Sequence, residues 1–152
     1  MFRSIITYFI FLILPFFSLA QSEQKVKWEY TAVNKGNQNF EIRLIAKIDK
    51  GWHLYSSKQS SDAIALPTAI RFSKHPLILL KGEIAEQGTL IDQMDPATKS
   101  KSRYYAGQVI FVQKVVRKKK VNTSLNGEIE FMVCDDRQCL PPSTVKFQVK
   151  LQ

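Results

Sequence analysis

Cysteine, glycine and proline are all scarce in this chain of 152 residues, which contains two, six and six of them. Two cysteines exclude a disulfide-dense miniprotein. Long apolar runs are scarce as well, because the only one spans residues 5–17 and is interrupted by Thr7, Tyr8 and Pro15. Apolar residues make up 45% and charged residues 23% of the chain, which excludes wholesale disorder, collagen and a coiled coil. The length favours a single domain.

Residues 1–20 have the three parts of a secretory signal peptide. Arg3 gives a positive start, the apolar run follows, and Ser18-Leu19-Ala20 places small residues before a cleavage site. The run is too short to span a membrane comfortably, which disfavours an uncleaved anchor. We therefore expect a mature domain over 21–152 that is soluble and lies outside the cytoplasm, where disulfides persist.

The mature part has the patterning of β-strands. Apolar and polar residues alternate over 40–48 and again over 145–151, and 104–116 is rich in β-branched and aromatic residues. Shorter candidate strands lie at 26–30, 68–73 and 77–81. No amphipathic helix of three turns is present. Many short strands separated by turn signals predict an all-β sandwich.

Turns and loops can also be predicted. Asn126-Gly127 is the residue pair most typical of a two-residue hairpin turn. The longest predicted loops span 56–65 and 90–102, and long loops on a rigid sandwich often carry function. The basic run 117–120 lies between two predicted strands, so we interpret it as a solvated hairpin end. Export argues against nucleic acid as its partner, despite a pI of about 9.6.

The most informative segment is Cys134-Asp-Asp-Arg-Gln-Cys139. In the strand that precedes it, Ile129, Phe131 and Val133 share an apolar face, and Cys134 falls on the opposite, polar face. Without a bulge, we expect Cys134 to point away from the core. A turn of four residues can bring the two cysteines within bonding range.

The spacing of the cysteines leaves two interpretations open. A ring this small removes only about 2 kcal/mol of unfolded-state entropy, so it is a weak staple and a plausible labile pair. Asp135 and Asp136 line the predicted site and oppose thiolate formation, whereas Arg137 favours it. Pro141 and Pro142 lack N–H groups and end the hairpin ladder, which exposes the site. A reversible redox pair and a local structural disulfide both remain possible at this point.

Four motifs occur in the order found in a known family. They are Gly51-Trp52-His53-Leu54-Tyr55-Ser56, Pro67-Thr68, Val112-Gln113-Lys114-Val115, and Cys134-Asp135-Asp136 through Cys139-Leu140-Pro141-Pro142. On these residues the chain resembles, over 25–152, the amino-terminal periplasmic domain of the DsbD family of transmembrane thiol:disulfide reductases.

The resemblance implies an immunoglobulin-like β-sandwich that carries a redox cysteine pair on a hairpin. Family members take electrons from a membrane-embedded partner and pass them to periplasmic thioredoxin-like proteins, including disulfide isomerases and cytochrome c maturation factors. By motif match, Cys134 and Cys139 would be the exchanging pair, with Cys139 reacting first. His53 and Tyr55 would lie beside them, and His53 would add a titratable group where the family has an aromatic residue.

The chain also departs from the family pattern. Family members often have one more residue between their two cysteines than this chain has. A cap loop with a Phe shields the disulfide in the family, but the corresponding stretch 92–105 has no Phe, and Met94 is its nearest apolar candidate. The sequence contains one sandwich and no membrane domain, so we expect a separate membrane electron donor. The alternative function is a non-catalytic binding module with a structural hairpin disulfide.

No cofactor or metal is expected. His53 and His75 are 22 residues apart, and neither forms a short ligand motif with a cysteine. The sequence also contains no phosphate loop and no defensible Ser-His-Asp arrangement. The cysteine pair is therefore the predicted chemical site.

Overall fold

The computed structural model describes residues 25–61 and 63–152, and these form eleven strands. The strands are β1 (Val26–Asn34), β2 (Asn39–Ile48), β3 (His53–Tyr55), β4 (Ala69–Phe72), β5 (Ile78–Gln87), β6 (Leu90–Met94), β7 (Lys101–Ala106), β8 (Gln108–Arg117), β9 (Thr123–Phe131), β10 (Val133–Cys134) and β11 (Ser143–Leu151). Within these residues there is no helix of the length and apolarity needed to cross a membrane. The predicted signal peptide, residues 1–20, lies outside the described part.

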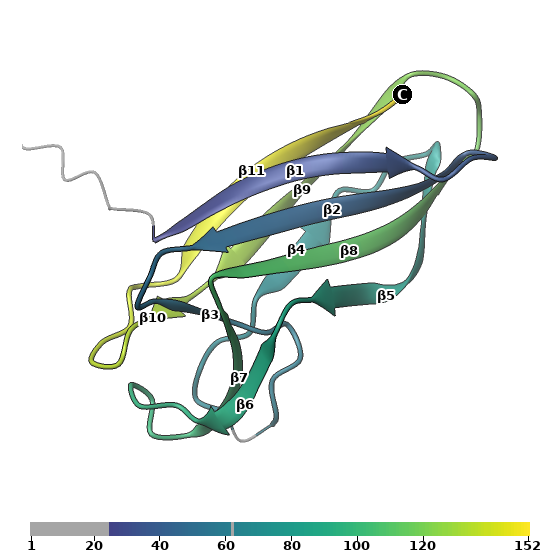
Figure 1. Cartoon of the computed structure of the whole chain (residues 1–152). Coiled ribbons are helices and arrows are strands. Elements are labelled where there is room, and N and C mark those ends of the chain that lie inside the picture. Colours follow the sequence, from purple (N-terminus) through teal and green to yellow (C-terminus); the bar gives the residue numbers. More distant parts are fainter. Residues whose placement is uncertain (1–24, 62) are drawn as a thin grey trace, which may run out of the picture.

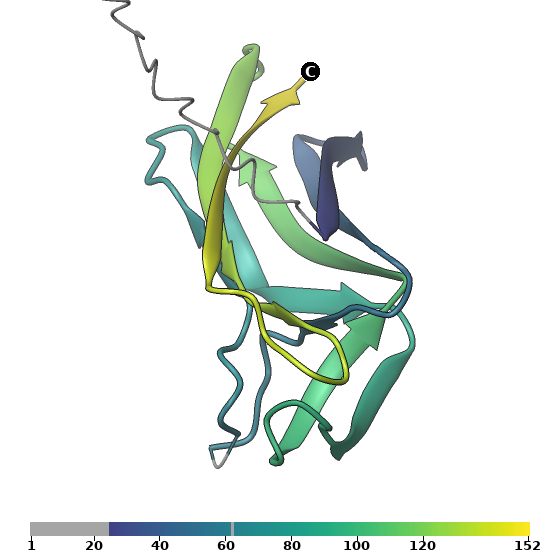
Figure 2. The same cartoon turned by 90° about the vertical axis from the view of Figure 1, so that its left-hand side faces the viewer.

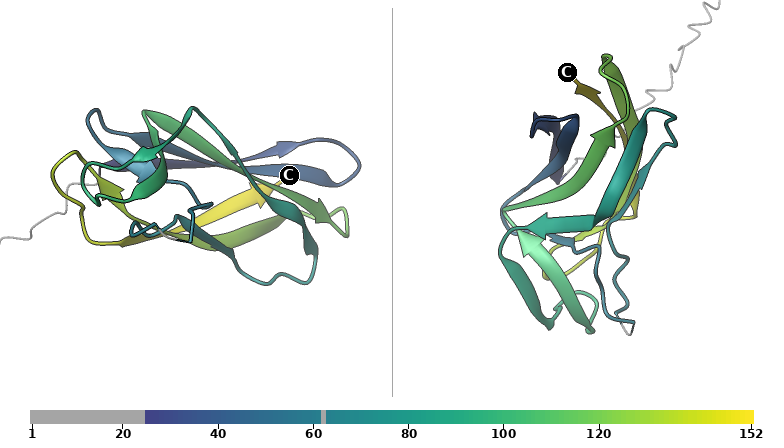
Figure 3. Two further views of the ribbon diagram at one scale, coloured as in Figure 1. Left: turned by 90° about the horizontal axis from the view of Figure 1, so that it is seen from below. Right: turned by 90° about the vertical axis from the view of Figure 1, so that its right-hand side faces the viewer.

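Two antiparallel sheets face each other and a third extends one end of the sandwich. The first sheet has the order β1-β2-β8-β5 and the facing sheet has the order β11-β9-β4 (Figures 1 and 2). The third sheet, β10-β3-β7-β6, lies at the lower end in Figure 1, and Figure 3 shows the layers from two further sides. The predicted all-β, immunoglobulin-like sandwich with the cysteine pair on a hairpin is confirmed.

The core follows from the alternating pattern of the strands. In β2, every second residue from Phe40 to Ile48 is buried, as the sequence predicts. Ile42 and Leu44 from this strand form one cluster with Phe111 of β8 and, from the facing sheet, Ile129 and Val149. Full burial of such a side chain contributes about 1.5–3 kcal/mol, so this cluster holds the two sheets together.

Gly107 divides the apolar run 104–116, which the sequence predicts as one strand. Its φ of 73° lies in the left-handed region that glycine adopts without strain. The chain therefore turns between β7 and β8, and β7 joins the third sheet while β8 stays in the first. Tyr104 and Tyr105 of β7 are thereby carried to the end of the sandwich that holds the cysteines. The predicted loop 90–102 is also partly wrong, because it contains β6, which pairs with β7.

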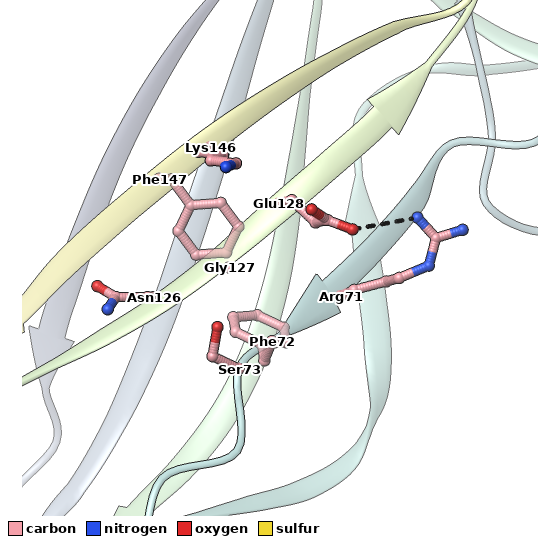
Figure 4. A pocket seen from close by; sticks show the side chains of 8 residues that line it. All are labelled: Arg71, Phe72, Ser73, Asn126, Gly127, Glu128, Lys146 and Phe147. Atoms are coloured by element: carbon pink, nitrogen blue, oxygen red, sulfur yellow. Dashed lines mark ion pairs between the residues drawn. The ribbon is translucent and has the colours of Figure 1, made fainter.

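The hairpin predicted at Asn126-Gly127 is wrong, because both residues lie inside β9. Gly127 lies opposite Phe147 of β11 and Phe72 of β4, and Figure 4 shows these rings around it. A Cβ at this position would overlap the Phe147 ring and lie 2.6 Å from the Arg71 carbonyl oxygen. Glycine is needed here for close packing and not for a turn.

The basic run 117–120 does not end a hairpin either. It begins at the last residue of β8 and leads to β9, and these two strands belong to the two facing sheets. Arg117 itself is buried, and its guanidinium donates hydrogen bonds to the carbonyl oxygens of Val121 and Leu151. The three lysines that follow it are exposed on the connection between the sheets.

Candidate functional site

The cysteine hairpin starts where β10 pairs with β3, with Cys134 opposite His53. The Asp135 N–H donates to the Gln138 carbonyl oxygen at 2.9 Å, and Asp135 Oδ1 accepts from the N–H groups of Arg137 and Gln138 at 2.8 Å each. These two backbone donors hold the pKa of Asp135 below its ordinary value. Asp136 is exposed. The carboxylate of Asp135 therefore fixes the turn that brings the two cysteines together.

A disulfide joins Cys134 and Cys139, and its two sulfurs lie in different environments. Cys134 is fully buried, whereas Cys139 is exposed near the tip of the hairpin. An incoming thiolate can therefore approach Cys139 from solvent and cannot reach Cys134 in the same way.

The burial of Cys134 corrects the prediction that it would lie on the polar face. Strand β9 ends at Phe131, and the irregular residue Met132 separates it from β10. Val133 and Cys134 are consecutive, yet both are buried. Val133 packs in the main core, and Cys134 packs in a second, smaller cluster with Tyr55 and Tyr104. The alternation itself continues through Met132, because Val133 stays on the main-core face and Cys134 lies with Met132 on the opposite face. That face is buried at this end of the sandwich because Tyr55 and Tyr104 cover it.

A buried hydrogen-bond network lies directly behind Cys134. The Tyr55 hydroxyl oxygen is 3.0 Å from Cys134 Sγ and 2.8 Å from Asp95 Oδ2. His53 Nε2 lies 2.9 Å from Asp95 Oδ2 and 3.3 Å from the Tyr55 hydroxyl. The Tyr104 ring packs on the imidazole at a centroid distance of 4.3 Å. Because a phenol has one hydrogen, Tyr55 donates either to Asp95 or to the sulfur, and a charged carboxylate is the stronger acceptor.

The charge states of the network follow from its contacts. Burial by itself raises the pKa of Asp95, but the Thr98 N–H, the Tyr55 hydroxyl and the charge on His53 outweigh it and hold that pKa below its ordinary value. Burial and the neighbouring Asp95 raise the pKa of Tyr55 well above that of free tyrosine. At neutral pH Asp95 is therefore a carboxylate and Tyr55 a neutral phenol.

Sequence reasoning placed most of these residues together but missed Asp95. His53, Tyr55, Cys134 and Cys139 meet as the motifs predict, on strands β3 and β10 and the hairpin. Met94 is 62% exposed, and its neighbour Asp95 points into the site with no exposed surface. The sequence prediction for 92–105 considers an apolar cover and does not include this carboxylate. Its one sequence signal is the Asp95-Pro96 pair, which is typical of a turn.

The Asp95 carboxylate is positioned by its own loop. Its Oδ1 accepts from the N–H groups of Ala97 and Thr98, at 2.8 and 3.0 Å, while its backbone N–H donates to the Ser100 carbonyl oxygen at 2.9 Å. One oxygen thus anchors the loop between β6 and β7 and the other enters the network. Over 25–61 and 63–152, no group of three or more His, Cys, Asp or Glu side chains has an arrangement that could hold a metal ion.

The fold and the site define a β-sandwich domain that carries a disulfide-bonded cysteine pair on a hairpin at one end. Residues 19–151 match the family model described as thiol:disulfide interchange protein DsbD, N-terminal, and the chain belongs to this family. The predicted resemblance is thereby confirmed. No curated protein matches the sequence significantly.

Two solved structures show the same fold. One is the DsbD N-terminal domain of Neisseria meningitidis in the reduced form, with 16% identity, a TM-score of 0.53, and coverage of 86% of this chain and 88% of that one. The other is the complex between the DsbD N-terminal and PilB N-terminal domains of Neisseria meningitidis. It has 14% identity, a TM-score of 0.50, and coverage of 86% and 87%.

Proposed function

We propose that this domain relays electrons between a separate membrane reductase and thioredoxin-like proteins through Cys134 and Cys139. The relay takes place in the periplasm after removal of residues 1–20. Membership of the DsbD N-terminal family supports this proposal. The Neisseria meningitidis complex of a DsbD N-terminal domain with a PilB domain supports a protein as the partner.

The observation that carries the proposal is the unequal exposure of the two sulfurs. In the reduced domain, the Cys139 thiolate attacks a disulfide of the acceptor protein and forms a mixed disulfide, and the acceptor's second sulfur leaves as a thiolate. The Cys134 thiolate then attacks the Cys139 sulfur. This step closes the internal disulfide, and the acceptor leaves with both sulfurs reduced. Two electrons have moved from the domain to the acceptor.

A structural role for the disulfide is the second candidate function, and one observation favours it. Cys134 is fully buried within a hydrogen-bonded cluster, as in a disulfide that serves only to hold a loop. The reduction potential distinguishes the two functions. A structural bond has a potential below about −300 mV, and a labile exchanging pair has a higher one.

Trapping tests the proposal directly, and the two cysteines serve as a matched pair. The Cys134→Ser variant keeps the exposed thiol and lacks the resolving one, so it should accumulate a mixed disulfide with its partner. The Cys139→Ser variant keeps only the buried thiol and should trap far less. The adducts can be separated on a non-reducing gel after expression in the periplasm and identified by mass spectrometry.

The double variant Cys134→Ser/Cys139→Ser is the control for non-covalent carry-over. Equal trapping by both single variants would contradict the assigned order of attack. No adduct with either variant, together with a potential below about −300 mV, would establish the structural role instead.

A further inference from the structure

Opening of the disulfide from the Cys139 side leaves an electron pair on a buried sulfur. When a thiolate attacks Cys139, Cys134 is the leaving group, and its sulfur has no exposed surface. A thiolate in such surroundings is poorly stabilised, because burial disfavours the charged form. Departure of this sulfur is therefore easiest when a proton reaches it during the step.

The Tyr55 hydroxyl oxygen lies 3.0 Å from Cys134 Sγ. Its hydrogen points to Asp95 while the disulfide is closed, and it can turn to the sulfur once bond breaking makes the sulfur a charged acceptor. It does not act alone, because burial and Asp95 raise the pKa of Tyr55 and a bare phenolate would be unstable there. The phenol must receive one proton as it gives up another. His53 Nε2 lies 3.3 Å from the same hydroxyl oxygen. Its one hydrogen, which Asp95 accepts while the disulfide is closed, can pass to that oxygen when Tyr55 gives up its own.

We propose that His53, as an imidazolium, is the proton source for the departing Cys134 sulfur, with Tyr55 as the group that passes the proton on. In the balanced step, the partner's sulfur bonds to Cys139 Sγ as the bond between the two cysteines breaks. Cys134 gains the electron pair and one proton from Tyr55, and Tyr55 regains a proton from His53, which ends neutral. When the internal disulfide closes, the same path runs in reverse. This inference rests on the proposed exchange function.

The charged and titratable groups around the imidazole come from three elements. Asp95, from the β6–β7 loop, accepts a hydrogen bond from His53 Nε2 at 2.9 Å and pairs with its positive form. Asp135, on the cysteine hairpin, is close enough for its carboxylate to be stabilised by a charge on His53. From β7, the Tyr104 ring stacks on the imidazole. Of these groups, Asp95 fixes the position of His53 Nε2 beside the Tyr55 hydroxyl.

The rate of reduction by dithiothreitol between pH 5.5 and 8.5 tests this path. Each rate constant is divided by the thiolate fraction of dithiothreitol, so that the remaining pH dependence belongs to the protein. For the wild type, the corrected rate should be about tenfold or more higher at the acid end of this range than at the alkaline end, because general acid catalysis is typically worth at least that much. In His53→Gln, the corrected rate should be low and independent of pH.

Two further variants complete the experiment. Tyr55→Phe removes the passing hydroxyl but leaves the ion pair between His53 and Asp95, so it should lose the pH dependence as well. His75→Gln is the control, because that histidine bonds Thr123 at the other end of the sandwich and should leave the profile unchanged. A wild-type corrected rate that is flat, or a His53→Gln profile that parallels it, would overturn the inference. If His53→Gln does not fold, the Tyr55→Phe profile decides in the same way.

The failure of this inference is distinguishable from the failure of the proposed function. If cysteine variants trap a partner but the corrected rates are flat, exchange occurs without proton delivery from His53. If the rates depend on His53 but no partner is trapped and the reduction potential is that of a structural disulfide, the proton path exists and the relay does not.

Discussion

Replacement of Asp95 by asparagine tests the buried hydrogen-bond network behind Cys134, because Asp95 is the residue to which both His53 and Tyr55 bond. The side chain keeps its size but loses its charge and one of its two acceptor oxygens. In the wild type, those oxygens accept from four donors, namely the N–H groups of Ala97 and Thr98, the Tyr55 hydroxyl and His53 Nε2. Whichever way the new amide is oriented, its NH2 group faces two groups that previously donated to an oxygen.

The expected loss follows from these contacts. Hydrogen bonds to a charged group contribute about 1.5–3 kcal/mol each, and part of this is regained because the hydroxyl and the imidazole can reorient. We expect the free energy of unfolding to fall by about 3 kcal/mol. For a domain of this size that corresponds to a decrease in Tm of about 10 °C.

The pH dependence gives a second, independent readout. The pKa of Asp95 is lowered in the folded protein, so its contribution to stability is complete above the unfolded pKa and is lost as the pH falls through the folded value. The difference between wild type and Asp95→Asn should therefore shrink as the pH falls below about 4. Urea unfolding followed by tryptophan fluorescence at several pH values measures it.

Asp92→Asn is the matched control, because it makes the same aspartate-to-asparagine change three residues earlier, on strand β6. Asp92 is 42% exposed and pairs with Lys101 and Arg103 at 3.6 and 3.5 Å. Exposed pairs contribute about 0–1 kcal/mol, so this variant should remain close to the wild type. Equal destabilisation by the two variants would refute the network.

Three further predictions concern strand packing, the anchoring of a loop and the exposure of the two cysteines. Gly127→Ala should lower the free energy of unfolding by about 2 kcal/mol, because its Cβ overlaps the Phe147 ring; urea unfolding measures this. Glu86→Gln should cost about 2 kcal/mol near neutral pH, because that carboxylate accepts four hydrogen bonds that pin the β3–β4 loop and β7. The folded pKa of Glu86 is lowered, so its contribution is lost as the pH falls through that value, and the difference from the wild type in thermal unfolding should shrink as the pH is lowered below about 4. After reduction, iodoacetamide should modify Cys139 on the order of ten times faster than Cys134, which mass spectrometry of a time course detects; similar rates would contradict the burial of Cys134.

Local sequence patterns predicted the strands where one face alone is buried. The alternation from Phe40 to Ile48 corresponds to β2 residue by residue, because the period of a strand is two and each side chain has a fixed face. The same alternation from Val145 to Leu151 corresponds to β11. The pattern was sufficient because nothing interrupts these strands.

The pattern failed where tertiary contacts override the local signal. Alternation correctly placed Cys134 on the face opposite Val133, but Tyr55 and Tyr104 cover that face, so it is buried and not exposed. Asn126-Gly127 is typical of a turn, yet Gly127 lies within β9 because the Phe147 ring occupies the space of a side chain. The dipeptide Asn126-Gly127 alone does not reveal that the Phe147 ring, from a strand about twenty residues later, packs against it.

The sequence by itself determined where the candidate exchange site lies, because it contains only two cysteines and a short polar turn joins them. Only the tertiary structure decided which sulfur is open to attack and what lies behind the other. Asp95 is 42 residues from His53 and 40 from Tyr55, and the pairing of β7 with β3 and β6 brings them into contact. The chemistry of Cys134 depends on that long-range pairing, since burial and hydrogen bonds, and not residue type alone, set the charge of a buried group.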